Sequence, residues 1–361
     1  MNLKKIATIS VMTIIVVLIT FAVVIWSITF HPKQTEYPEV FSISEAPVLK
    51  PGQKIRVLNY NVQYMASKNY VFFYDYVDGN GPDDRPSPED ITKTINRVAK
   101  IIIDENPDVI LLQEVNDGAK ATDYEDQLER LMKLLPKEYV SYTSAFYWKA
   151  GFVPHPRIMG PVGMKLATIS KYKLSKAIRH QLATIPSDPL THQFNFKRAI
   201  LEARLPVEGG KDFVVMNTHL DAFSQGTDTM QRQVAFLKEL LIQRGDEGFP
   251  WIIGGDFNLL PPGQYDSLQE SERHYFQKET EMQSIYDQFN VIPALEDLNK
   301  GNDQQWNTHL PNGLGLNAPD RILDYYVYSN NLSLLESYVR HKDTYIVSDH
   351  LPIIAEFKLP Q

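Results

Sequence analysis

The longest uncharged segment of the chain is the strongest constraint on what it can fold into. The segment "IATISVMTIIVVLITFAVVIWSITF" runs from Ile6 to Phe30 without Asp, Glu, Lys or Arg. As a helix it would be about 37 Å long, at about 1.5 Å per residue, which crosses a hydrocarbon core of about 30 Å. No face of that helix would be polar, which argues against a buried helix of a soluble core. The sequence therefore predicts one transmembrane helix over residues 6–30.

The flanks of this segment indicate its orientation. Lys4 and Lys5 precede it, and positive charges favour the cytoplasmic side of a membrane. Trp26 lies near the other end, as interfacial aromatic residues do. A secretory signal is the alternative, but it has a shorter apolar region and a small-x-small cleavage site, which "WSITFHP" does not offer. We expect a single-pass signal anchor with residues 1–5 in the cytoplasm and the remainder outside it.

The remaining chain is predicted to form a linker and one domain. Residues 31–53 carry four prolines and are typical of a tether, whereas residues 54–361 show no linker-like composition. Cysteine is absent, which excludes disulfides, thiolate catalysis and thiolate zinc sites. The formal net charge of −8 is opposite to that of a stable nucleic-acid binder. A nuclease remains open, because bound cations reverse the local charge.

Strand-like and helix-like segments are readable along the domain. Apolar runs predict strands over 54–62, 108–115, 165–171, 198–205, 212–220, 251–258, 322–329 and 351–359. One helix is expected to begin at Ser87 as N-cap, with Pro88 at its first position, and a second over 229–245. Early strand–helix–strand alternation gives way to many strands with few helices. This order predicts an α/β fold with two packed sheets flanked by helices.

Polar side chains at the ends of apolar strands are the informative anomaly, because burying them unpaired is costly. "NYNVQ" places Asn59, Asn61 and Gln63 on one strand face, since side chains alternate along a strand. "ILLQEV" places Glu114 after four apolar residues. "MNTHLD" places its amide and its imidazole on one face. Each of these alone is compatible with a structural role.

Three later motifs are more specific. "WIIGGDFN" ends a strand in two glycines and then points Asp256 and Asn258 the same way. "RILDYYVYS" buries Asp324 in an apolar strand, where an unpaired carboxylate would take up a proton. Asp324 therefore needs a partner, and Asp349 and His350 of "TYIVSDHLPIIAEF" supply a candidate.

Together these motifs suit metal-assisted phosphate chemistry. Oxygen ligands without thiolates suit Mg²⁺, with Mn²⁺ or another divalent cation as alternatives. A histidine backed by a buried aspartate suits acid–base work near neutral pH. Amide and imidazole donors suit the negative oxygens of a phosphate, and Asn217, Asn258 and His219 are the predicted phosphate-binding residues.

The ordered set resembles the endonuclease/exonuclease/phosphatase superfamily, which includes deoxyribonuclease I, abasic-site endonucleases, neutral sphingomyelinases and inositol polyphosphate 5-phosphatases. The motifs that carry it are "NYNVQ", "LLQEV", "MNTHLD", "GGDFN", "ILDYYVYS" and "VSDHLP", over about residues 54–359. The resemblance implies a four-layer α/β sandwich, two packed mixed β-sheets flanked by helices, that hydrolyses phosphate esters with Mg²⁺. It also implies that Asn61, Glu114 and Asp349 are metal ligands.

The resemblance implies catalytic roles for a further set of residues. Asp256 and Asn258 would position the attacking water and the phosphate. His350 would contact the phosphate or handle the proton, with Asp324 orienting it. His219 would stabilise the phosphate or assist the leaving oxygen.

Two positions depart from parts of the family pattern. In 5-phosphatases the aspartate immediately precedes Arg-Ile-Leu, which here is Asp320, so Asp320 is the alternative to Asp324 as partner of the histidine. Some relatives carry an acid where Gln63 stands, so no additional metal ligand is expected there.

The substrate is less constrained. Residues 63–88 and 145–161 are predicted loops rich in aromatic and basic side chains, which insert into membranes, stack on bases or pack on the domain. The anchor and the acidic balance favour a lipid or other small phosphodiester. An anchored extracytoplasmic DNA or RNA endonuclease is the main alternative. An inactive binding module and a phosphatase facing the cytoplasm are the other hypotheses, and no protein partner is expected.

Overall fold

The computed structural model describes residues 3–76, 78–298 and 303–361. Residues 1 and 2 belong to the segment 1–5 that was predicted to be cytoplasmic, and they lie outside the described residues. The α-helices are α1 Leu3–Ile28, α2 Pro88–Glu105, α3 Gln127–Met132, α4 Thr191–Phe194, α5 Thr229–Asp246, α6 Met282–Tyr286 and α7 Leu295–Leu298. The strands are β1 Thr35–Glu36, β2 Val40–Ser42, β3 Lys54–Asn61, β4 Val109–Asn116, β5 Ser141–Val153, β6 Gly160–Ser170, β7 Lys176–Gln181, β8 Ala199–Leu205, β9 Phe213–His219, β10 Trp251–Asp256, β11 Asn290–Ile292, β12 Asp324–Tyr328, β13 Ser333–Val339 and β14 Ile353–Lys358.

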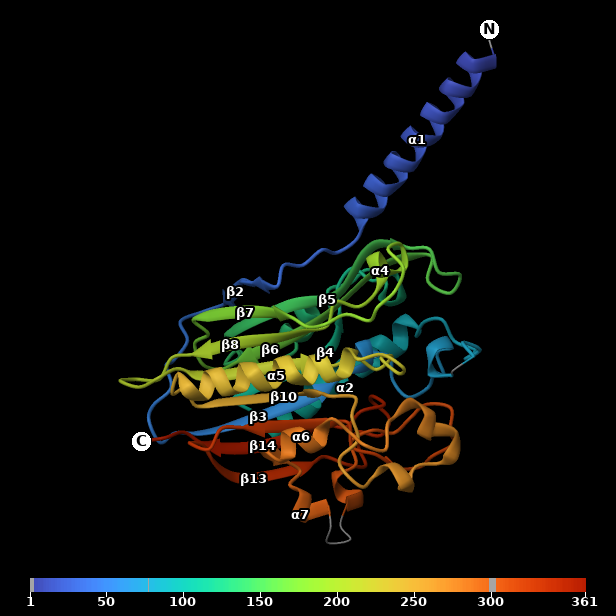
Figure 1. Ribbon diagram of the computed structural model, residues 1–361. Helices are drawn as coiled ribbons and strands as arrows, with labels where there is room; N and C mark the ends of the chain where they lie inside the picture. The colour runs from blue at the N-terminus through green and yellow to red at the C-terminus, as the bar shows by residue number, and fades with distance from the viewer. Residues whose placement is uncertain (1–2, 77, 299–302) are drawn as a thin grey trace.

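Two seven-stranded sheets form the body of the protein (Figure 1). One has the order β1-β7-β8-β9-β10-β12-β11 and the other β13-β14-β3-β4-β6-β5-β2. Both are mixed, because β9 and β10 run parallel, as do β3 and β4, among antiparallel neighbours. The prediction of two packed mixed sheets is confirmed.

The main core lies between the sheets and includes Val57, Leu111, Val215 and Ile353, which have no exposed surface. Gly254 of β10 lies where the sheets touch. A Cβ added there would sit 2.9 Å from Leu111 Cδ1 and 2.7 Å from the ring of Tyr326. The glycine therefore permits a close approach of the sheets two residues before Asp256.

Helices cover the outer faces, as expected for four layers. The face of β3 and β4 opposite to the main core packs against α2 and α3. Ser87 Oγ accepts a hydrogen bond from the Asp90 amide and Pro88 is the first helical residue of α2, so the predicted start of this helix is confirmed. In α5 the residues predicted to face inward are buried: Met230, Val234, Leu237 and Leu241. This helix ends at Asp246, one residue beyond the predicted end.

Residues 31–53 do not form the free tether that their prolines suggested. Thr35 and Glu36 pair with β7, and β2 pairs with β5, so the segment extends both sheets at one edge. Leu49 has no exposed surface and belongs to the main core. We call residues 31–53 the N-terminal strap. The prediction of a linker was wrong, because proline at sheet edges is compatible with short strands.

Two further expectations about local structure were wrong. Most of the predicted loop 145–161 is a hairpin formed by β5 and β6, which pair antiparallel over most of their length. Strand β3 ends at Asn61, and Gln63 lies in a 3₁₀ turn with a left-handed backbone (φ 45°), so Gln63 does not continue the strand face.

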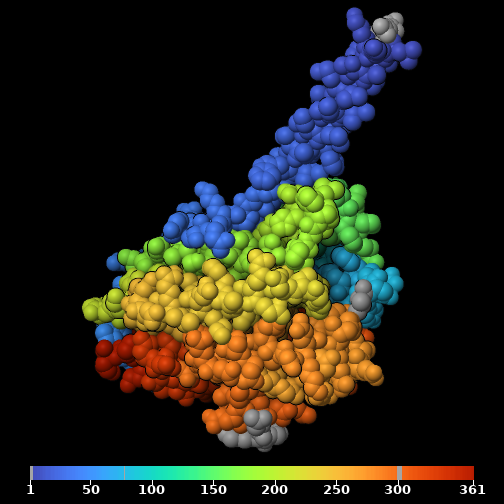
Figure 2. Space-filling view, in the orientation of Figure 1, coloured from blue at the N-terminus to red at the C-terminus, as the bar shows by residue number. Residues whose placement is uncertain are grey.

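The predicted N-terminal apolar helix is present as α1, which projects alone from the domain (Figure 2). Almost all of its side chains are exposed, so it is not a core helix. A helix of this length and composition serves as a membrane span or as a signal sequence.

Candidate active site

Polar side chains gather where strands of the two sheets meet at one end of the sandwich. The register places Asp256 of β10 opposite Asp324 of β12 on one side and His219 of β9 on the other. Asn61 at the end of β3 faces this row from the other sheet, since its Nδ2 donates to Asp256 Oδ2 at 3.0 Å. The strand pairing therefore brings together residues that are far apart in the sequence.

A cavity of about 740 Å³ opens over this row. Its floor includes Glu114, His219, Asp256, Asn258, Asp349 and His350. Aromatic side chains are prominent in its walls, among aliphatic and charged residues: Tyr64, Phe73, Tyr74, Trp148, Phe196, Phe223, Tyr275 and Phe276. The site thus combines a polar floor with walls that are in large part apolar, which is typical of small-molecule pockets.

Asp256 is the centre of the cluster and is almost completely buried. Its Oδ2 lies 3.4 Å from His219 Nε2 and 3.5 Å from His350 Nε2. Its Oδ1 accepts a hydrogen bond from the Asn258 amide at 2.9 Å. Burial raises the pKa of Asp256 to about 6, although the charge on His350 opposes this. Its carboxylate can therefore accept a proton near neutral pH.

His350 is held by Asp324. Its Nδ1 lies 2.7 Å from Asp324 Oδ2, and both side chains are buried. Burial would lower the pKa of His350, but Asp324, Asp256 and Asp349 together raise it well above its ordinary value. Asp320, the alternative partner, instead accepts hydrogen bonds from its neighbour Arg321 at 2.7 and 2.9 Å. The geometry therefore pairs His350 with Asp324.

His219 has the opposite electrostatic environment. Burial, together with the charges of Arg198 and His350, lowers its pKa well below the usual value. Its Nδ1 lies 3.3 Å from Tyr147 Oη. One imidazole of the site is thus kept charged and the other neutral, a separation that assigns different roles to similar groups.

Glu114 lies beside Asn61, whose Nδ2 donates to Glu114 Oε1 at 3.2 Å. Glu114 has a left-handed backbone (φ 58°) at a β-bulge in β4. Such bulges re-aim side chains next to active sites. Burial, then the charges of Asp349 and Asp256, raise the pKa of Glu114 to about 7. Buried carboxylates that face one another in this way are stabilised by a cation.

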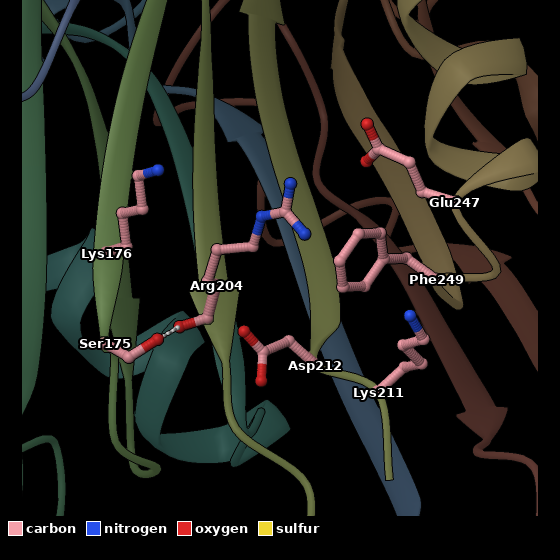
Figure 3. A pocket seen from close by; sticks show the side chains of 7 residues that line it. All are labelled: Ser175, Lys176, Arg204, Lys211, Asp212, Glu247 and Phe249. Atoms are coloured by element: carbon pink, nitrogen blue, oxygen red, sulfur yellow. Dashed lines mark hydrogen bonds between the residues drawn. The ribbon is translucent and has the colours of Figure 1, made fainter.

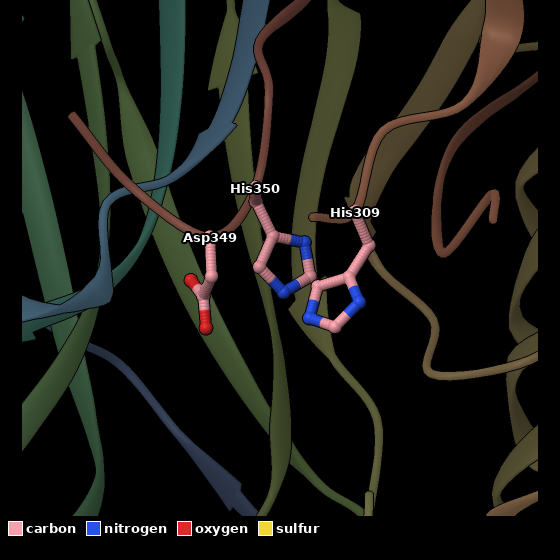
Figure 4. A group of neighbouring side chains, drawn as sticks. All are labelled: His309, Asp349 and His350. Atoms are coloured by element: carbon pink, nitrogen blue, oxygen red, sulfur yellow. The ribbon is translucent and has the colours of Figure 1, made fainter. Parts of the chain in front are cut away.

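The third predicted metal ligand, Asp349, is half-buried at the cavity floor (Figure 4). The structure places candidate ligand atoms within 4.8 Å of one another in two groups, His309–Asp349–His350 and Asp256–Asp324–His350. Asp349 also lies close enough to Glu114 to raise the pKa of that carboxyl. The donor set of carboxylates, amide and imidazole fits a divalent cation.

Asn217 does not reach the cavity. It has no exposed surface, and its Nδ2 donates to the carbonyls of Leu112 and Ala167 at 3.0 and 2.9 Å. Its Oδ1 accepts from Gln113 at 2.7 Å. All its hydrogen-bonding groups are used between the sheets, so the prediction that Asn217 binds phosphate is corrected to a structural role. Asn258 does line the cavity, with Nδ2 bound to the Leu220 carbonyl at 3.1 Å.

Among the cavity residues that were not predicted, His309 and Arg198 stand out. The His309 ring lies 4.5 Å from the His350 ring, and its buried Nδ1 has no hydrogen-bond partner among the described residues. Arg198 is 2% exposed, and its Nε and Nη1 have no hydrogen-bond partner there either. The sequence features that could have indicated them were a histidine in "WNTHLP" and a charged residue at the start of an apolar strand. Both features are common at structural positions.

Arg198 differs from the other guanidinium groups of the cavity. Arg85, Arg157 and Arg321 each pair with a carboxylate. Arg198 makes no ion pair within the described part of the chain, and lies over the rings of Tyr147 and Phe196, 5.0 and 4.4 Å from their centres. A buried cation that is unpaired and borders a cavity is suited to bind an anion.

A second hollow lies at the other end of β8 (Figure 3). It is lined by Ser175, Lys176, Arg204, Lys211, Asp212, Glu247 and Phe249. Arg204 is neutralised by Glu202 at 2.6 Å and stacks on Phe249. The hollow holds charges of both signs and none of the predicted site residues.

Comparisons with known proteins agree with this geometry. The model of a protein family described as "Endonuclease/Exonuclease/phosphatase family" matches residues 58–350 of the chain. Among solved structures, the chain is similar to an endonuclease/exonuclease/phosphatase from Beutenbergia cavernae DSM 12333, with a TM-score of 0.58 and 21% identity, covering 85% of this chain and 72% of that one. It is also similar to one from Bacteroides vulgatus, with a TM-score of 0.52 and 16% identity, covering 85% and 99%.

The human Nocturnin catalytic domain, solved with a bound sulfate anion, gives a TM-score of 0.50 and 19% identity, covering 89% of this chain and 97% of that one. At these identities the likeness shows a common fold. A comparison with curated proteins found no match.

Proposed function

Because the chain belongs to the endonuclease/exonuclease/phosphatase family, whose members are hydrolases of phosphoester bonds, we propose that it is a Mg²⁺-dependent phosphodiesterase of a membrane-held substrate. The observation that carries the proposal is the arrangement around Asp256. One buried carboxylate contacts Asn61, His219 and His350, and Asp324 holds His350 from behind. This arrangement supplies a base, a charged imidazole and a cation site in one cavity.

The residues that would hold the cation are Asn61, Glu114 and Asp349. The raised pKa of Glu114, about 7, fits such a site, because the carboxyl is buried beside two further carboxylates. When bound, the divalent cation would neutralise phosphate oxygens and polarise the ester for attack. Mn²⁺ would fit the same oxygen-rich ligands.

The protein groups divide the remaining work. Asp256, with Asn258 beside it, would accept a proton from the attacking water. The oxygen of that water would form a bond to phosphorus while the ester P–O bond breaks. His350, charged at neutral pH, would stabilise the negative phosphate oxygens and donate a proton to the leaving oxygen. His219 stays neutral, so its role would be a hydrogen bond to the phosphate and not proton donation.

Arg198 supports the assignment of an anionic substrate. Its unpaired N–H groups lie at the cavity, close enough to His219 to lower that residue's pKa. We propose that Arg198 binds a phosphate oxygen of the substrate.

A lipid or other small phosphodiester is the favoured substrate class. The walls of the cavity are mainly aromatic and aliphatic, which suits a substrate with an apolar part beside its phosphate. Arg85, Arg157 and Arg321 at the cavity are each paired with a carboxylate. Their positive charge is therefore largely neutralised and would attract a long polyanion only weakly. An extracytoplasmic nuclease is the second candidate, because the exposed ring of Phe223 and its aromatic neighbours could stack on bases.

We propose that α1 is a signal anchor, with its N-terminus in the cytoplasm and the catalytic domain outside it. Lys4 and Lys5 before the apolar segment support this orientation. A reporter fused to Gln361 tests the orientation, because a protease that cannot cross the membrane removes it only if the domain is extracytoplasmic. A reporter on the cytoplasmic side would contradict this proposal.

The experiment that tests the function is hydrolysis by the full chain with Mg²⁺ or with a chelator. The substrates are sphingomyelin vesicles, phosphoinositide vesicles, and single- and double-stranded DNA. We expect chelator-sensitive turnover confined to lipid. Turnover confined to DNA would support the nuclease instead, and no Mg²⁺-dependent turnover of any phosphoester would contradict the proposed function.

A further inference from the structure

The end of α1 is joined to the hairpin that forms one wall of the active-site cavity. Ile28 Cβ lies 3.5 Å from the position of a Cβ added at Gly151, and Thr29 forms a β-bridge with Ala150. Trp148, which lines the cavity, precedes Ala150 on the same strand. Two strand residues span only about 7 Å. The helix end and the cavity wall are therefore close neighbours.

The junction is fixed by several contacts. The ring of His31 stacks on that of Trp26 at 3.5 Å, and the Phe30 ring lies 5.4 Å from the guanidinium carbon of Arg179. The N-terminal strap then pairs with β7. The chain therefore passes from the helix directly into a sheet edge, and the helix extends from the end of the domain that carries α4 (Figure 1).

Exposed apolar side chains surround this junction. Phe152 and Met159 of the β5–β6 hairpin are 39% and 51% exposed, and Leu190, just before α4, is 49% exposed. The α4 segment adjoins the hairpin, because Trp148 Nε1 donates to the Phe194 carbonyl at 2.8 Å. Single exposed apolar residues are ordinary, but a group of them at the end of an apolar helix marks an interface.

The charge of this region also suits a membrane. Residues 139–187, which include β5, β6 and β7, contain no Asp or Glu in a chain of net charge −8. Lys149 of the hairpin, three residues before Phe152, is exposed. Basic residues beside exposed apolar side chains are typical of surfaces that bind anionic lipids.

We propose that this end of the domain, defined by Trp26, Phe152, Met159 and Leu190, docks on the surface of an anionic bilayer. The cavity then takes its phosphoester from the bilayer in which α1 is anchored. This inference rests on the proposed function for the anchor and for hydrolysis. It adds that the hairpin, and not only the helix, contacts lipid, and that the substrate arrives from the membrane plane.

The docking surface is tested without any catalytic readout. The chain has no cysteine, so single labels are introduced by Phe152→Cys and Met159→Cys, with Leu335→Cys as control. Leu335 is an apolar residue of similar exposure (44%). It lies on β13, which is at the edge of the sheet that is farther from β5. The labelled full chain is reconstituted in vesicles of phosphatidylcholine and phosphatidylserine that contain a nitroxide-labelled lipid.

We expect the lipid nitroxide to quench a fluorophore at 152 and 159 and not at 335. Equal quenching at all three positions, or no quenching at 152 and 159, would overturn the docking surface. Quenching at 152 and 159 without hydrolysis of any phosphoester would support the surface and contradict the proposed function, so the two failures are distinguishable.

The substrate route is tested by a double variant, Phe152→Asp with Met159→Asp. Neither side chain lines the cavity. We expect hydrolysis of a vesicle-borne phosphoester to fall at least about tenfold, and hydrolysis of water-soluble bis-(p-nitrophenyl) phosphate to stay unchanged. Equal loss on both substrates, or no loss on vesicles, would overturn the route from the membrane.

Discussion

At the scale of single residues, the site is organised by its carboxylates. Asp256, Asp324 and Asp349 lie around His350, and their charges raise the pKa of this histidine well above its ordinary value. Asp324 Oδ2 contacts Nδ1 of His350. The other ring nitrogen of His350, Nε2, faces Asp256 on the cavity floor. In the proposed mechanism, this arrangement would make His350 the proton donor and Asp256 the proton acceptor.

Removing the partner of His350 is expected to cost activity. In Asp324→Asn the imidazole loses the charge that raises its pKa, and we predict that turnover falls at least about 10²-fold. The measurement is the pH profile of phosphoester hydrolysis. The matched variant Asp320→Asn, which changes the rejected partner, should retain turnover, and the reverse ranking would contradict the pairing.

Arg198 is expected to contribute to substrate binding and not to the stability of the fold. Arg198→Met removes a buried cation without a partner, so the free energy of unfolding should stay equal or rise. The Michaelis constant for a phosphoester should rise at least about tenfold, the effect of losing one charge-assisted contact. Denaturant unfolding and steady-state kinetics check both, with exposed Arg232→Met as control. A destabilised variant with normal kinetics would show that Arg198 is structural.

The pKa of Glu114 gives a dependence of cation binding on pH. In the folded protein without cation this carboxyl holds its proton up to about pH 7, above the ordinary value of 4.5. The folded state thus binds more protons between these values, so its stability from this group falls as pH rises through them. A cation binds the ionised form, so Mg²⁺ should raise the melting temperature more at about pH 8 than at about pH 5.5.

Thermal unfolding with and without Mg²⁺ measures this difference. Glu114→Gln should remove most of it, whereas exposed Glu208→Gln should not. A Mg²⁺ effect that is the same at both pH values would contradict the assignment of Glu114 as a ligand.

At the scale of elements, the N-terminal strap is part of the domain. Leu49 has no exposed surface in the main core, so Leu49→Ala should lower the free energy of unfolding by about 2–5 kcal/mol. Ile43 of the same strap is 65% exposed, and Ile43→Ala should change it by less than about 0.5 kcal/mol. Chemical denaturation of the two variants measures both, and equal small effects would mean that the strap is detached in solution.

The elements that could be predicted are those with a strong local pattern. Buried strands such as β4 and β10 and the capped helix α2 follow from apolar runs, glycine and the Ser87–Pro88 start. Strands β5 and β7 were missed, as were the edge strands β1, β2, β11 and β13. At a sheet edge, pairing between distant segments leaves little local signal. For the same reason Asn217 was placed in the site, since its partners Gln113 and Ala167 lie on other strands.

At the scale of the whole molecule, two sheets carry the candidate site, and one apolar helix, the proposed anchor, projects from them. The family motifs in the sequence were sufficient to predict the fold and most of the cluster, because they lie at strand ends that the fold brings together. The contact of α1 with the β5–β6 hairpin could not be predicted, since it depends on the packing of Ile28 against Gly151.

The most direct test of the central claim is the turnover of the full chain on vesicle-borne and soluble phosphodiesters with Mg²⁺, measured beside His350→Ala. The account predicts chelator-sensitive hydrolysis that falls at least about 10²-fold in the variant while the variant keeps its fold. Unchanged hydrolysis in a folded His350→Ala protein, or hydrolysis that is insensitive to the chelator, would contradict it.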